Sequence, residues 1–318
     1  MNKGPLISIV ICCHNRSTDV SECVGVLIPQ IGGAAEVILV DSASDPNVQA
    51  KLAKLAILYP SVKLKRVNKP GLALARNCGV HSAAGEWVVF LDDDVVPFPD
   101  WWEKLLAAVA SAPPGQAVIG GGIHPRWPDG MSGERLSERW KMFLSLAESD
   151  KPGSVTEGYA VNGANYAIRR GVLLDIGGFS ERFGRIGASL ISGDESEVTQ
   201  RVLDAGLHAG FDPAFKVYHK ISPERLKLSW ILRRTFWEGV GDMRIFRGRD
   251  QPLPSHLRPL KLIASLPVLL ILSIVQFHNH DWKIRLAMCL GACVGRLTTT
   301  GTGASANRQR FADSRPSQ

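Results

Sequence analysis

One apolar run that ends in three consecutive carboxylates constrains the fold more than any other stretch of this sequence. Residues Trp87–Leu91 are branched or aromatic, and the acidic triplet Asp92–Asp94 follows without a break. A run of this length, bounded by Gly85 and Pro97, is typical of a buried strand in a largely parallel sheet. In open α/β sheets ligands bind beyond the carboxyl ends of such strands. The sequence therefore places a ligand site at this triplet.

The triplet also predicts a metal. Adjacent carboxylates repel one another, and they are costly to bury without a partner. A hard divalent cation such as Mg²⁺ or Mn²⁺, shared with ligand phosphates, removes both costs. A solvated acidic turn is the alternative for any acidic triplet, but a buried strand that runs directly into the triplet favours the cation.

Apolar strands alternate with helical segments through the first hundred residues. Strands are expected over 8–13, 36–40, 62–67 and 87–96, and helices over 17–28, 47–58 and 71–80. This alternation predicts βαβ units, and hence an α/β domain with a mostly parallel sheet and helices on both faces. The first two strands end in the polar turns His14–Ser17 and Asp41–Asp45, which we expect on the same sheet edge as the acidic triplet.

The second half of the chain is less regular. We expect a helix to about residue 112, a strand over 116–123, a helical flap over 132–149 and a helix that opens at Gly193-Asp194-Glu195. Carboxylates in a first helical turn are stabilised by the helix dipole, and Glu197 is spaced to pair with Arg201. These acidic residues therefore have a structural interpretation besides a catalytic one. Neither a P-loop nor a dinucleotide fingerprint follows the first strand.

Positive charge is concentrated towards the C-terminus. Between Lys216 and Lys261 there are eleven Lys or Arg against four Asp or Glu, and this excess equals the net charge of +7 of the whole chain. Such a patch indicates an anionic partner, and a lipid surface is favoured over nucleic acid. The six cysteines show neither zinc spacing nor a disulfide framework, which indicates reduced thiols in a cytosolic protein.

Two apolar stretches, Leu262–Phe277 and Ile284–Leu297, follow the basic segment. The first is shorter than the roughly twenty residues of a spanning helix. Either both stretches are core helices of the soluble domain, or they form a hairpin that lies in the cytoplasmic face of a membrane. We expect the hairpin, followed by a disordered polar tail over 298–318.

Six short motifs in a fixed order resemble a family 2 glycosyltransferase of the GT-A fold over roughly residues 5 to 240. They are Asp41, Ala75-Arg76-Asn77, Asp92-Asp93-Asp94, Gly163-Ala164-Asn165, Gly177-Gly178-Phe179 and Gly193-Asp194-Glu195. The resemblance implies a GT-A domain over 1–228, followed by a basic helix and membrane-associating C-terminal helices over 229–297.

The resemblance also implies roles for single residues. The donor nucleotide is expected to contact Asn15, Asp41, Arg76, Asn77, Asp92 and Asp93. The Mg²⁺ or Mn²⁺ ion is expected on Asp94, while His219 is either a further ligand or a structural residue. The acceptor region is expected around Asn162, Gly163 and Asn165.

The general base is less clearly assigned. The family uses the second residue of a Glu-Asp pair, which corresponds to Glu195. This chain has the reversed order Asp-Glu, so Asp194 stays a competitor and Glu197 a weaker one.

The implied activity is an inverting, metal-dependent transfer of a sugar from a nucleotide-sugar, expected to be a UDP-sugar. The acceptor is a hydroxyl of a saccharide or lipid-linked molecule in cell-surface polysaccharide or glycolipid synthesis, at the cytoplasmic face of the inner membrane. No Gln-x-x-Arg-Trp pattern follows Arg233 and Arg234, which favours transfer of a single sugar. A sugar-nucleotide nucleotidyltransferase is an alternative, although its glycine-rich, lysine-containing loop is missing after the first strand. A catalytically silent GT-A module that binds nucleotide or carbohydrate is the other.

Overall fold

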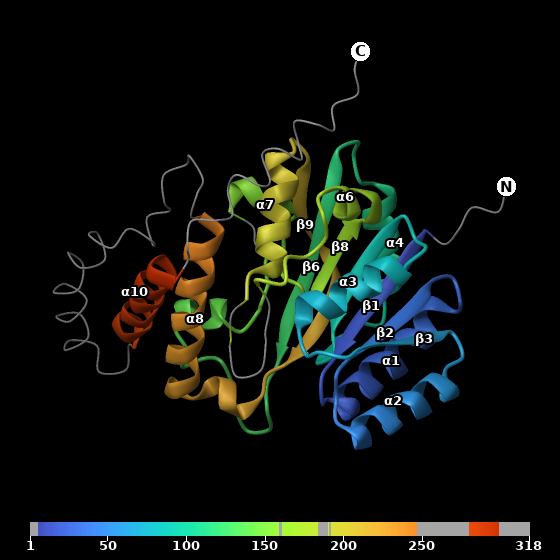
Figure 1. Cartoon of the computed structure of the whole chain (residues 1–318), viewed down its shortest axis with the longest axis horizontal. Helices are drawn as coiled ribbons and strands as arrows, with labels where there is room; N and C mark the ends of the chain where they lie inside the picture. Colours follow the sequence, from blue (N-terminus) through green and yellow to red (C-terminus); the bar gives the residue numbers. More distant parts are fainter. Residues whose placement is uncertain (1–5, 159–160, 184–189, 191, 247–279, 299–318) are drawn as a thin grey trace, which may run out of the picture. The chain divides into compact units, whose positions relative to one another are not determined.

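The computed structural model describes residues 6–158, 161–183, 190, 192–246 and 280–298 (Figure 1). The chain divides into two compact units. The first comprises Met1–Ser189 with Gly193–Leu226, and the second comprises Leu190–Ser192 with Lys227–Gln318. The expected disordered tail lies outside the described residues, apart from Thr298.

The first unit is built on one mixed sheet with the strand order β3-β2-β1-β4-β8-β6-β9-β5, and β7 pairs with β9. The strands are β1 (Ile7–Cys13), β2 (Glu36–Ser42), β3 (Val62–Val67), β4 (Trp87–Asp92), β5 (Val95–Pro97), β6 (Gln116–Arg126), β7 (Gly153–Ser154), β8 (Asn165–Arg169) and β9 (His208–Lys220). Strands β3, β2, β1 and β4 are parallel, as are β6 and β9. The other pairs are antiparallel, including β8 with both of its neighbours, so the sheet is less parallel than expected.

The register of the parallel strands brings their polar ends together. Cys12 of β1 lies opposite Asp92 of β4, and Cys13 lies opposite Asp41 of β2. Because parallel strands end at a common edge, the turns that follow β1, β2 and β4 are neighbours there. This edge is the one that the sequence predicted as the ligand site.

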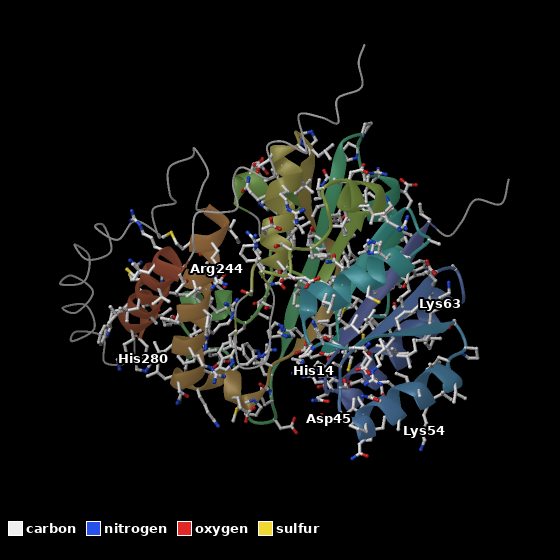
Figure 2. All side chains as sticks on the ribbon, viewed as in Figure 1. His14, Asp45, Lys54, Lys63, Arg244 and His280 are labelled. Carbon is white, nitrogen blue, oxygen red and sulfur yellow. The ribbon has the colours of Figure 1, made fainter. Side chains whose placement is uncertain are left out.

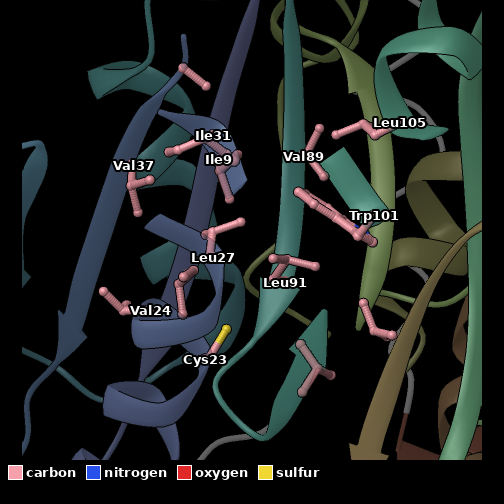
Figure 3. Close-up of a cluster of buried hydrophobic side chains, with 14 of the residues drawn as sticks. Ile9, Cys23, Val24, Leu27, Ile31, Val37, Val89, Leu91, Trp101 and Leu105 are labelled. Atoms are coloured by element: carbon pink, nitrogen blue, oxygen red, sulfur yellow. The ribbon is translucent and has the colours of Figure 1, made fainter. Parts of the chain in front are cut away.

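Helices cover both faces of the sheet. They are α1 (Ser17–Ile31), α2 (Pro46–Leu58), α3 (Leu72–Ser82), α4 (Trp101–Ala110), α5 (Glu138–Met142), α6 (Arg170–Asp175) and α7 (Asp194–Asp204). Successive residues of a strand point to opposite faces, so Ile9 and Val10 enter different cores. Ile9 belongs to a core that also contains side chains of α1 and α4 (Figure 3), and Val10 belongs to a core that also contains side chains of α3, α6 and α7.

The expected helical flap over 132–149 is mostly irregular. Only Glu138–Met142 forms a helix, which Ser137 caps by accepting a hydrogen bond from the backbone N–H of Trp140 at 3.2 Å. The buried Trp140 indole donates to the backbone oxygen of Arg225 at 3.2 Å. One buried aromatic side chain thus ties this segment to the chain after β9.

The second unit contains α8 (Leu228–Phe246) and α10 (Asp281–Thr298). A Cβ on Gly239 would overlap the Met288 backbone, and a Cβ on Gly291 would overlap the Phe236 backbone, so glycines allow the two helices to touch. Among the helices that the structure describes, none combines the length and the apolar character needed to cross a bilayer. The apolar stretch Leu262–Phe277 lies outside the described residues.

Candidate active site

The turns after β1 and β2 are joined by side-chain to backbone hydrogen bonds. Asn15, with φ at +58°, accepts from the backbone N–H of Asp45 at 2.8 Å, and its own N–H donates to Ser44 at 3.0 Å. Asp41 is buried and accepts from the backbone N–H of Ser44 at 2.9 Å. Figure 2 labels His14 and Asp45, one residue from each of these two turns. The structure therefore brings the predicted residues Asn15 and Asp41 to one site.

The acidic triplet forms a tight turn between β4 and β5, and its three side chains differ in exposure. The side chain of Asp92 is 35% exposed, whereas those of Asp93 and Asp94 are 9% and 4% exposed. Burial and the neighbouring Asp94 carboxylate raise the pKa of Asp93 to about 7. Two buried carboxylates this close need cations beside them.

Two arginines and a histidine surround Asp94. Arg16 Nη1 lies 2.6 Å from Asp94 Oδ2 and 3.0 Å from Asp93 Oδ1. Arg225 Nη2 lies 3.2 Å and His219 Nε2 lies 3.5 Å from the same Asp94 Oδ2. Burial alone would raise the pKa of Asp94, but the guanidinium groups of Arg225 and Arg16 beside it help to hold that pKa well below its ordinary value.

The residues around Asp94 fit a divalent cation in part. Arg225 Nη1 lies 2.8 Å from His219 Nε2, and because a guanidinium only donates, this nitrogen is the acceptor of a neutral imidazole. The buried Nδ1 of His219 has no hydrogen-bond partner. Asp94 and His219 thus supply two ligand atoms of the kind that Mg²⁺ and Mn²⁺ accept. No group of three or more His, Cys, Asp or Glu side chains suited to a metal occurs in the described part of the chain, so these side chains alone do not complete a metal site there.

Arg76 on α3 joins the acidic turn to the start of α7. Its buried guanidinium contacts Asp194 at 2.5 Å, Asp92 at 3.4 Å and Glu195 at 3.8 Å. It also lies over the ring of Phe90, 5.6 Å from the centroid. Burial opposes the charge, but Asp194, Asp92 and Glu195 outweigh burial and raise the pKa of Arg76. Arg76 therefore links the end of β4 to the candidate general bases.

The three candidate bases have different surroundings. The Asp194 side chain is 1% exposed and is paired with Arg76. Glu197 is paired with Arg201 at 2.6 Å, and Arg201 also donates to the backbone oxygen of Gly178 at 2.6 Å. The Glu195 side chain is 16% exposed, and burial together with the Asp194 carboxylate raises its pKa to about 8. Of the three candidate bases, Glu195 is thus the one suited to exchange a proton near neutral pH.

Gly163 and Asn162 lie beside the Arg76 network. A Cβ on Gly163 would overlap the Arg76 guanidinium, so glycine is needed for Arg76 to reach Asp194. The Asn162 side chain accepts from the backbone N–H of Ala164 at 3.3 Å.

The other two predicted asparagines have structural contacts. Asn77 holds the backbone of Phe179 through two hydrogen bonds of 2.8 Å, which leaves its nucleotide contact a prediction. Asn165 is fully buried, accepts from the Trp101 indole at 3.2 Å and donates to the backbone oxygens of Gly122 and Phe215 at 3.1 and 2.9 Å. Asn165 therefore braces the strands, and its place in the acceptor region stays a prediction.

Comparison with known proteins decides the family. Residues 8–161 match the model described as Glycosyl transferase family 2. This span contains the turns after β1, β2 and β4 and the Arg76 helix. This part of the chain belongs to glycosyltransferase family 2.

Among curated relatives, the glycosyltransferase is 25% identical over 236 residues to the glucosyl-dolichyl phosphate glucuronosyltransferase of Haloferax volcanii, which covers 73% of this chain and 75% of that one. It resembles the mannosyltransferase PcManGT of Pyrobaculum calidifontis, solved with GDP-Man and Mn²⁺, with a TM-score of 0.64 at 20% identity over 92% of this chain and 87% of that chain. It also resembles GalNAc-T7, solved with UDP, GalNAc and Mn²⁺, with a TM-score of 0.53 at 18% identity over 82% and 54%. These likenesses confirm the expected GT-A fold.

Sequence reasoning missed Arg16 and Arg225 as parts of the site of this glycosyltransferase. Arg16 was seen only as a member of the polar turn after β1, although its place at a strand end was a usable signal. Arg225 lies in a 3-10 turn, Pro223–Leu226, inside a basic segment that we interpreted as a surface patch. Its position 131 residues from Asp94 in sequence gave no local signal.

Proposed function

We propose that this glycosyltransferase is an inverting enzyme that uses Mg²⁺ or Mn²⁺ and transfers one sugar from a nucleoside-diphosphate sugar to an acceptor hydroxyl. The observation that carries the proposal is the Arg76 network, because it connects the acidic turn after β4 with a carboxyl group whose pKa is about 8. The buried Arg76 guanidinium thereby brings the proposed donor site next to the proposed general base. A purely structural acidic turn would not need this connection.

In the proposed donor complex, Asp41 hydrogen-bonds the nucleobase, Asn15 shapes the turn beside it, and the half-exposed Asp92 reaches the ribose. Asp94 and His219 would hold the cation through Asp94 Oδ2 and His219 Nε2, which lie 3.5 Å apart. A bound divalent cation supplies Lewis-acid stabilisation to the leaving diphosphate. Arg76 keeps Asp92 and Asp194 in place.

In the proposed transfer step, Glu195 takes the proton of the acceptor hydroxyl as the oxygen attacks the anomeric carbon. The bond from that carbon to the diphosphate oxygen breaks, and the nucleoside diphosphate leaves with the electron pair. A single displacement of this kind inverts the anomeric centre and needs no covalent intermediate. The proton then lies on Glu195 and returns to solvent.

We propose a lipid-linked saccharide at the cytoplasmic face of the membrane as the acceptor. The basic excess between Lys216 and Lys261 supports an anionic surface as partner. On α10 the exposed side chains Leu290, Val294 and Leu297 recur at helical spacing, as in helices that lie in a membrane interface. The Haloferax volcanii relative is named for a glucosyl-dolichyl phosphate substrate, which is lipid-linked.

A donor screen tests the proposal first. Thermal unfolding is measured with UDP- and GDP-sugars and Mn²⁺, because the family resemblance implies uridine whereas PcManGT was solved with GDP-Man. A ligand of the folded state raises the melting temperature by mass action. Transfer is then assayed for the stabilising donor on lipid-linked and free saccharide acceptors.

Asp94→Asn keeps the shape of the side chain and removes its charge. We expect it to lower transfer at least about 100-fold, while Asp129→Ala, at an exposed loop position, leaves transfer unchanged. Full activity of Asp94→Asn would contradict the proposal. Nucleotide binding without turnover on any acceptor would instead support the silent-module alternative.

A further inference from the structure

The Oδ2 atom of Asp94 is already occupied by two cationic side chains. Arg16 Nη1 contacts it at 2.6 Å and Arg225 Nη2 contacts it at 3.2 Å. A carboxylate oxygen has two lone pairs for such contacts. The two guanidinium groups therefore use both of them in this conformation.

His219 is occupied in the same way. Its Nε2 accepts from Arg225 Nη1 at 2.8 Å, so Arg225 spans both proposed metal ligands. A divalent cation that binds Asp94 Oδ2 and His219 Nε2 would need the lone pairs that the arginines now use, and it would be repelled by their positive charge. The cation and this arrangement of the two arginines therefore compete for the same two atoms.

We propose that Arg16 and Arg225 form a removable latch on the cation site, and that the donor diphosphate opens it. This inference rests on the proposed function. A guanidinium pairs with phosphate oxygens through parallel hydrogen bonds, so the diphosphate provides both arginines with a new anionic partner. The same diphosphate provides the cation with the oxygen ligands that the described protein side chains do not supply.

Arg16 and Arg225 differ in how much room their side chains have to move. Arg16 precedes α1 at its N-cap, and its side chain is 36% exposed, so it has room to turn towards a ligand. The Arg225 side chain is 9% exposed, which leaves it less room to move. The latch makes cation and nucleotide binding cooperative, because each removes an obstacle to the other.

Binding of Mn²⁺ alone tests the latch. Mn²⁺ affinity is measured without nucleotide by isothermal titration and by electron paramagnetic resonance of the free ion, in the full-length protein. We expect Arg16→Gln to bind Mn²⁺ about tenfold more tightly than wild type, within the range of ordinary coupling between sites. Arg126→Gln removes the same charge from an exposed residue whose Nη1 lies 2.7 Å from Glu22, and it controls for net charge.

Nucleotide affinity is expected to change in the opposite direction to Mn²⁺ affinity. With Mn²⁺ present, UDP and GDP are titrated, and we expect Arg16→Gln to weaken the nucleotide that wild type binds by about tenfold. A merely structural role of Arg16 would weaken both ligands together. Arg225→Lys keeps a positive charge but loses the fork that spans His219 and Asp94, so we expect tighter binding of Mn²⁺ alone here as well.

Three results are decisive. Tighter Mn²⁺ and weaker nucleotide binding in Arg16→Gln, with Arg126→Gln unchanged, supports the latch. Ordinary binding of Mn²⁺ with nucleotide in wild type, but equal or weaker binding of Mn²⁺ alone in both Arg16→Gln and Arg225→Lys, overturns the latch and leaves the proposed function intact. No Mn²⁺ binding with or without UDP and GDP in any variant overturns both.

Discussion

Glu195 makes a quantitative prediction about pH. Its pKa of about 8 has burial as the largest cause and the Asp194 carboxylate as the second, while Arg76 acts in the opposite direction. A general base must be ionised, and a pKa of 8 leaves it about 1% ionised at pH 6, about 9% at pH 7 and about 50% at pH 8. We therefore expect kcat/KM for the acceptor to rise about 50-fold between pH 6 and pH 8.

The assay follows release of the nucleoside diphosphate by chromatography. Initial rates are measured from pH 5.5 to 9.5 with saturating donor and Mg²⁺ and with acceptor well below KM. Glu195→Gln should lose about 100-fold or more in rate, together with the pH dependence. Asp194→Asn should move the rise to lower pH, because it removes the anionic neighbour and frees Arg76 to interact with Glu195.

Glu197→Gln is the matched control, because Glu197 is paired with Arg201 and lies two residues away. We expect its pH profile to keep the wild-type midpoint. A profile that is flat from pH 6 to 9 in wild type, or a rise that survives in Glu195→Gln, would refute the assignment of Glu195 as the base.

The same pKa has a consequence for stability. Because the folded state raises the pKa of Glu195 from 4.5 to about 8, it holds the proton more tightly than the unfolded chain does. The resulting stabilisation is present below pH 4.5 and is lost as the pH rises through 8. Glu195→Gln resembles the neutral form, so we expect its melting temperature to exceed that of wild type at pH 8.5 and to match it below pH 4.5.

Three further substitutions test the packing around the site and in the second unit. Gly163→Ala should displace Arg76 and lower kcat/KM at least about tenfold, whereas Gly171→Ala, which meets no atom within 4 Å, should leave the rate unchanged. Asn165→Ala removes three buried hydrogen bonds and should lower the free energy of unfolding, measured with urea, by about 3 kcal/mol. A loss of less than about 1 kcal/mol would contradict the bracing role of Asn165. Gly291→Ala should speed hydrogen exchange in α8 and α10 and leave β1 to β4 protected, because its Cβ would overlap the α8 backbone.

Much of the proposed donor side of the site was predictable from the chain. Asp41 and Asp92–Asp94 follow apolar runs, and the ends of parallel strands share one edge whatever the details of the loops. The hydrophobic periodicity of the sequence therefore predicted that these carboxylates lie close together. Because of the reversed Asp-Glu order, the sequence did not decide which carboxylate is the general base. The structure distinguishes the candidates by their ion pairs, since Asp194 pairs with Arg76 and Glu197 pairs with Arg201.

The later strands were harder to predict. Strand β9 was not expected over its length, because Asp212 and Pro213 interrupt its apolar pattern at the point where its register with β6 shifts. The antiparallel insertion of β8 between β4 and β6 also has no local signal, since a short strand with Asn165 at its start fits either direction. Strand direction depends on connections that periodicity does not describe.

The sequence by itself determined the alternation of strands and helices in the first hundred residues and the position of each carboxylate along them. Only the tertiary structure decided which cation neutralises which carboxylate. Arg16 and Arg225 reach Asp94 across 78 and 131 residues of chain, and Arg76 reaches Asp194 across 118. Hydrophobic periodicity is a local property of the chain, whereas charge pairing depends on distance in space, and that distance is set when the strands assemble.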